Sequence, residues 1–315
     1  MIAACGGGGK VTAKATAARL VSQAFTASGA VDSGRVALTL TLNLDGVKQL
    51  HGEPVTLDVS GPFQREASGQ LAADLSATID AAGDSANVEV ILLPGHVYVG
   101  IGGAFYDLPS ANTAGAHGPT GPSGGIFGTL GIDPHGWLTD LHDVGTADVG
   151  GVATDHVSAH VDVAGLLGAA TKLGGAGNSG TGNSGSASGS TGASGLAGML
   201  PLLAQAITSA TADVYTGVSD HIVRRLSLAV TFKVPAIGGA ALGGLSGGSL
   251  DFDATLTDLG RPETITPPAN AQPRSRLLNG IFDLESRFGS LASLFAGGTG
   301  GSFGGLFSSA GATSS

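Results

Sequence analysis

The stretch VALTLTLNL, residues 36–44, decides the fold because apolar and polar residues alternate in it without a break. Successive side chains of an extended strand point to opposite faces, so this stretch predicts a strand with one apolar face and one wet face. A strand of this kind belongs in an antiparallel sheet that packs on one side only.

The same alternation returns along most of the chain. It is found in residues 55–59, 71–79, 88–92, 97–101, 157–163, 226–234 and 250–256. Short glycine-rich turns between consecutive strands favour an antiparallel meander of about nine or ten strands. A sheet this wide does not lie flat, so the expected fold class is α+β with a large curved antiparallel sheet.

Few segments are available to cover the apolar face of that sheet. Helical spacing predicts a helix over residues 10–25, and further short helices are expected in residues 137–141, 163–173 and 196–207. These segments are rich in Ala and Gly and fill little volume, so a cavity lined by Leu and Val is expected beneath them. The candidate lining residues are Leu38, Leu40, Leu75, Val90, Val99, Leu228 and Val230. The alternative for each of them is an ordinary core position.

Composition and charge restrict the function. The chain has 315 residues, of which 42% are apolar, 12% are charged and 55 are glycine, and its net charge is -10. A surface of this sign repels phosphate backbones, so nucleic acid is not an expected partner.

The sequence contains no set of residues typical of a catalytic site or a cofactor site, so neither catalysis nor a cofactor is expected. Residues 121–125 and 244–248 match the Gly-x-Ser-x-Gly pattern, but no helix follows either serine. His156 and His160 lie on one predicted strand, about 13 Å apart, which is too far for two ligands of one metal. Asp251 and Asp253 fit a solvated strand face better than a catalytic pair.

The N-terminal segment Met1-Ile2-Ala3-Ala4-Cys5 has the form of a bacterial lipobox, in which the Cys thiol receives the lipid. Four glycines, residues 6–9, follow as a flexible tether. The charged and apolar regions of a secretory signal do not precede this segment, so the chain is interpreted as truncated. Lipidation of Cys5 would anchor the protein at the extracytoplasmic face of the membrane; a random initiator segment is the alternative.

The expected organisation has three parts. Residues 1–9 are the lipobox remnant and tether, and residues 10–268 form a lipid-binding domain interrupted by a disordered Gly/Ser loop at 174–195. Residues 269–315 hold an amphipathic helix and a low-complexity tail. The apolar side of that helix is formed by Leu277, Ile281, Leu284, Phe288, Leu291 and Phe295.

Several short motifs carry a family resemblance. They are Ile2–Cys5, Gly103–Pro109, Gly151–His156, Asp213–Gly217 followed by His221–Arg225, and Leu259–Pro262. Together, over roughly residues 10–268, they resemble the mycobacterial LppX/LprG-type lipoproteins, whose fold is similar to the LolA/LolB carriers. Tyr215 stands where that family usually has Trp. The resemblance implies a U-shaped half-barrel over helices, an apolar cavity, and binding of acylated lipids or glycolipids.

Two functions remain from the sequence. The first is a membrane-anchored carrier of a lipid or glycolipid that works with an envelope transporter. The second is a structural or protein-interaction surface lipoprotein whose sheet is fully packed. Neither requires an enzyme, and the two differ in whether the apolar face of the sheet is filled.

Overall fold

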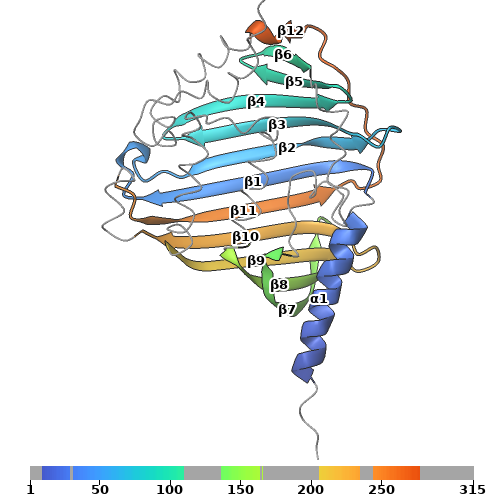
Figure 1. Cartoon of the computed structure of the whole chain (residues 1–315), viewed down its shortest axis with the longest axis vertical. Coiled ribbons are helices and arrows are strands. Elements are labelled where there is room, and N and C mark those ends of the chain that lie inside the picture. The colour runs from blue at the N-terminus through green and yellow to red at the C-terminus, as the bar shows by residue number, and fades with distance from the viewer. Residues whose placement is uncertain are drawn as a thin grey trace, which may run out of the picture.

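The computed structural model describes residues 9–28, 31–109, 136–163, 165, 206–234 and 244–276. Within these ranges one α-helix, α1 (Gly9–Ser28), crosses one side of a single twelve-stranded sheet (Figure 1). No helix in these ranges is long and apolar enough to cross a membrane.

The sheet is ordered β12-β6-β5-β4-β3-β2-β1-β11-β10-β9-β8-β7. Its strands are β1 (Ser33–Asp45), β2 (Val55–Arg65), β3 (Leu71–Ala81), β4 (Asp84–Leu93), β5 (His96–Ile101), β6 (Ala104–Pro109), β7 (Leu138–Val149), β8 (Val152–Val161), β9 (Ile207–Gly217), β10 (Val223–Lys233), β11 (Gly247–Thr257) and β12 (Gln272–Pro273). Neighbouring strands are antiparallel except β12, which runs parallel to β6. The expected α+β fold with a large antiparallel sheet is therefore confirmed.

Two strands have no clear signature in the sequence. β7 lies at the edge of the sheet with most of its residues exposed, so it lacks an unbroken apolar row. The inward residues of β9, Ala210 and Ala212, are small. They give the sequence of this strand no clear apolar row, so it predicts neither a strand nor a helix. The helix expected over 137–141 is wrong, because Leu138 begins β7. The helix expected over 196–207 cannot reach its predicted end, because Ile207 begins β9.

Register keeps the two sides of the sheet chemically distinct. Leu38 lies opposite Val59 on β2 and Ala254 on β11, and Thr39 lies opposite Asp58 and Asp253. The side that carries Leu38 is called the apolar face, and the side that carries Thr39 is called the polar face. The predicted period of two is confirmed across the centre of the sheet.

The main core lies where α1 packs on β7, β9 and β10. The helix contributes buried small and aromatic residues, among them Ala17, Val21 and Phe25. Val214 and Leu226 on the sheet are 0% and 2% exposed. Small residues on α1 allow close approach to the strands, so this part of the apolar face is filled.

The end of α1 is joined to β10 by one buried hydroxyl. Ser28 Oγ donates to the carbonyl of Ala24 at 2.7 Å and accepts from the backbone N–H of Val223 at 2.9 Å. Ser28 is 2% exposed and Val223 is 0% exposed, so water does not replace either bond easily. This contact fixes where the helix leaves the sheet.

An extended connection, residues 258–271, runs from β11 along the strand ends to β12, as the orange trace in Figure 1 shows. It is held by the bond from Gly260 N–H to the Ser33 carbonyl at 2.9 Å and by the bond from Glu263 N–H to Gln64 Oε1 at 2.6 Å. It places β12 beside β6, so the C-terminal end of the described chain reaches the far edge of the sheet.

Candidate ligand-binding face

All seven candidate lining residues lie on the apolar face. Ladder pairing joins Leu75 to Val90 and Val90 to Val99, across β3, β4 and β5. Leu228 and Leu40 both lie opposite Phe252 of β11, which stands between their strands. Strands from both halves of the chain therefore contribute to one continuous apolar surface.

Burial divides that surface into two regions. The covered region consists of the apolar-face residues of β8–β10 that belong to the main core, where Val157, Val214 and Leu226 are at most 2% exposed. The open region consists of partly exposed residues on β1–β5. Its members are Leu38, Leu40, Leu42, Leu57, Val59, Leu75, Ile79, Val88, Val90, Leu92, Val97 and Val99. None of these side chains ionises, so the open region offers only apolar contact.

The candidates do not all belong to the open region. Val230 is 8% exposed and is a member of the main core. Leu228 and Leu75 are partly exposed and pack against that core. Leu38, Leu40, Val90 and Val99 are partly exposed and belong to neither buried cluster of the described residues. Val230 is thus better described as core.

Buried clusters close the open region at both ends of its strands. At one end Val36, Phe63 and Ala73 are at most 6% exposed and join the main core. At the other end Val47, Leu50 and Ala81 form a second, smaller core around the short helix η1 (Lys48–Leu50). The open region is therefore bordered by buried residues at both ends of its strands.

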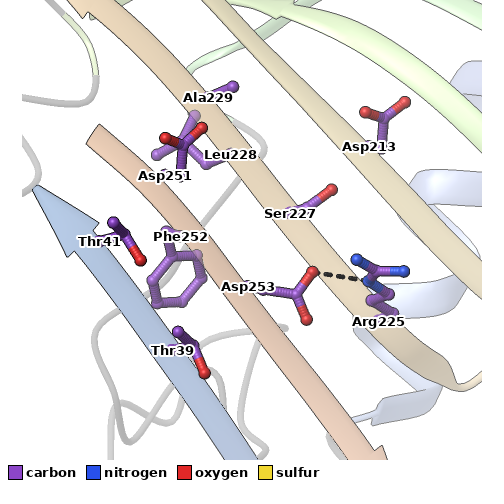
Figure 2. A pocket seen from close by; sticks show the side chains of 10 residues that line it. All are labelled: Thr39, Thr41, Asp213, Arg225, Ser227, Leu228, Ala229, Asp251, Phe252 and Asp253. Carbon is purple, nitrogen blue, oxygen red and sulfur yellow. Dashed lines mark hydrogen bonds and ion pairs between the residues drawn. The ribbon is translucent and has the colours of Figure 1, made fainter. Parts of the chain in front are cut away.

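The polar face carries a shallow hollow of about 340 Å³ (Figure 2). Its lining residues are Thr39, Thr41, Asp213, Arg225, Ser227, Leu228, Ala229, Asp251, Phe252 and Asp253. Arg225 Nε donates to Asp253 Oδ2 at 2.6 Å, with both side chains substantially exposed. Leu228 is the one member of the seven candidate lining residues that borders this hollow, so the hollow does not correspond to the expected apolar cavity. Asp251 and Asp253 lie on the polar face, as the alternation predicts.

His156 lies in an ordered cluster on the same face rather than free on the surface. Its Nε2 is 2.8 Å from Asp213 Oδ1, and its ring stacks on Tyr215 with the ring centres 4.3 Å apart. The guanidinium of Arg225 lies 5.6 Å from the centre of the Tyr215 ring. Burial, then the Asp213 charge, raises the pKa of the Tyr215 hydroxyl. Sequence reasoning misses this cluster because it depends on the pairing of β8, β9 and β10.

A carboxyl pair occupies the polar face behind the open region. Burial, followed by the charge of Asp74 and a hydrogen bond to it, raises the pKa of Glu89. No group of three or more His, Cys, Asp or Glu suited to a metal ion occurs among the described residues. Cys5 and the 174–195 loop lie outside those residues, as do nearly all of 163–173 and most of 196–207.

Comparison with known structures finds two mycobacterial proteins. LprF from Mycobacterium bovis is 16% identical, with a TM-score of 0.42 over 81% of this chain and 98% of that one. The lipoprotein LppX from Mycobacterium tuberculosis is 14% identical, with a TM-score of 0.41 over 80% of this chain and 99% of that one.

Neither a family model nor a curated protein matches the chain.

Proposed function

We propose that this protein is an envelope lipoprotein that binds the acyl chain of a lipid or glycolipid in the open region and carries it without chemical change. The observation behind the proposal is the set of partly exposed Leu, Val and Ile residues on one face of β1–β5, bordered at both ends by buried clusters. The main core, by contrast, is already filled by α1.

The driving force would be removal of the acyl chain from water. Each buried CH₂ contributes about 0.8 kcal/mol, so a chain of about sixteen carbons gains roughly 12 kcal/mol at most. Association costs about 4 kcal/mol or more in lost freedom. The balance supports binding that is tight enough to carry a lipid and weak enough to release it. Contact of this kind selects chain length rather than a particular headgroup.

The competing function is a structural or interaction lipoprotein whose sheet accepts no ligand. If this function is correct, a larger side chain should destabilise the fold as much in the open region as in the covered region. Overpacking a filled core costs about 1–3 kcal/mol, whereas a larger side chain on a partly exposed face meets fewer neighbours. The two functions therefore predict different results for the same substitution at two positions.

The test compares Leu40→Trp with Val230→Trp in delipidated protein. Leu40→Trp should melt within about 2 °C of the wild type and bind a fluorescent fatty acid at least about tenfold more weakly. Val230→Trp, in the filled core, should lower the melting temperature by about 2–4 °C per kcal/mol lost. Wild type that binds no probe, together with equal destabilisation in both variants, would leave the structural lipoprotein as the better function.

Membrane attachment through Cys5 is a separate part of the proposal. It is supported by the lipobox form of residues 2–5 and by the glycine tether at 6–9. When the chain is expressed behind a complete signal peptide, a palmitate analogue should label the wild type and not Cys5→Ser. Equal labelling of both proteins would remove the anchor and leave the lipid-binding proposal standing.

A further inference from the structure

The hollow on the polar face is built around a row of side chains that the proposed lipid function does not use (Figure 2). Asp213 of β9 lies opposite Ser227 of β10, and Ser227 lies opposite Asp253 of β11. Asp253 in turn lies opposite Thr39 of β1. Residues that lie opposite one another share a face of the sheet, so carboxylates and hydroxyls alternate across four neighbouring strands. The row is therefore about 14 Å long, at about 4.8 Å per strand.

The two carboxylates of this row are held in place by partners. Arg225 Nε donates to Asp253 Oδ2 at 2.6 Å, and His156 Nε2 lies 2.8 Å from Asp213 Oδ1. Tyr215 links the two pairs, because its ring stacks on the His156 ring and its centre lies 5.6 Å from the Arg225 guanidinium. A ligand that binds here meets side chains that are already ordered, so less conformational entropy is lost on binding.

The charges in the hollow favour a neutral ligand. Two of its three carboxylates already have partners, and the third, Asp251, adds negative charge that repels an anion. A metal ion is not favoured, because the described part of the chain contains no group of three or more ligating side chains suited to one. The remaining capacity is for hydrogen bonds. The hydroxyls of Ser227 and Thr41 can donate and accept, the carboxylate oxygens can accept, and the N–H groups of Arg225 can donate.

We infer that this hollow binds a saccharide of one or two sugar rings. Sugar hydroxyls both donate and accept hydrogen bonds, so they match a surface on which donors and acceptors alternate. The volume of about 340 Å³ lies at the small end of ligand sites, and the methyl group of Ala229 in the lining offers apolar contact to the C–H groups of a ring. The open region lies on the other side of the sheet, so the saccharide is a ligand separate from the acyl chain. The inference therefore does not rest on the proposed function.

The test titrates the full chain, without lipid, with disaccharides of glucose, galactose, mannose and arabinose, and follows the backbone amide signals by NMR. At least one disaccharide should shift the amides of Ser227 and Asp253 in a saturable manner and leave those of Val90 and Val157 unchanged. If no disaccharide shifts them, the inference is wrong. If putrescine shifts them and no disaccharide does, the hollow is a site for cations and the inference is equally wrong.

Asp251→Asn is the informative variant, because it removes a charged acceptor and leaves the two partnered carboxylates in place. Loss of one charge-assisted hydrogen bond should weaken disaccharide binding about tenfold. Asp80→Asn is the matched control, since Asp80 lies opposite Thr56 on the polar face of β3, outside the hollow, and its replacement changes the net charge equally. The control should bind like the wild type, and both variants should melt within about 2 °C of it. Binding that is weakened equally in the two variants, or in neither, would show that the disaccharide does not bind in the hollow.

Discussion

The covered region and the open region are built from the same kind of strand, yet they differ in what packs on them. β10 alternates Leu226, Leu228 and Val230 with polar residues, just as β1 alternates Leu38, Leu40 and Leu42. Leu226 is 2% exposed beneath α1, whereas the three leucines of β1 are all partly exposed. The difference shows that alternation selects a face, and that the packing partner decides whether that face is buried core or stays partly exposed.

The largest effect expected from this comparison comes from leucine truncation in each region. Leu226→Ala should lower the free energy of unfolding by about 2–5 kcal/mol, because it leaves a cavity in a filled core. Leu40→Ala should cost less than about 2 kcal/mol, because its side chain is only partly removed from water. Urea denaturation of both variants measures the two costs. Equal losses would mean that the two regions are packed alike.

A smaller effect is expected at the junction that holds α1 over the covered region. Ser28→Ala leaves the buried N–H of Val223 without a partner and should cost about 1–3 kcal/mol. Thr26→Ala is the matched control, because the Thr26 hydroxyl bonds the Ser22 carbonyl on the exposed side of the same helix. That variant should change stability by about 0.5 kcal/mol or less. A Ser28→Ala protein as stable as the control would show that the junction does not fix the helix.

The smallest effect concerns pH and the polar face behind the open region. The pKa of Glu89 is raised in the folded protein, so protonation of this carboxyl stabilises the fold at acid pH. That stabilisation is lost as the pH rises through the raised pKa and the carboxyl ionises. The Glu89→Gln side chain stays neutral at every pH, so the variant does not lose this stabilisation. The melting temperature of the variant minus that of the wild type should therefore increase from about pH 4 to about pH 7. Thermal melting across that range, with the exposed Glu53→Gln as control, measures the trend. A constant difference, or one that decreases, would contradict it.

Sequence reasoning gives the sheet and its apolar face, because strict alternation leaves little choice of side. It does not find β7 or β9, whose inward residues are too polar or too small to stand out. It also places Val230 with Leu40, although one is core and the other is open. That distinction depends on what packs over each strand, which the strand sequence does not record. The His156 and Tyr215 stack is missed for the same reason, since it is created by pairing between strands.

The central claim is that an acyl chain lies on β1–β5 and not beneath α1. The most direct measurement is the methyl spectrum of delipidated protein titrated with a fatty acid that carries a nitroxide on its chain. Broadening should be strongest for Leu40, Val90 and Val99, and weakest for Val157 and Val214 in the filled core. Broadening centred on Val157 and Val214, or none at all at saturating fatty acid, would contradict the claim.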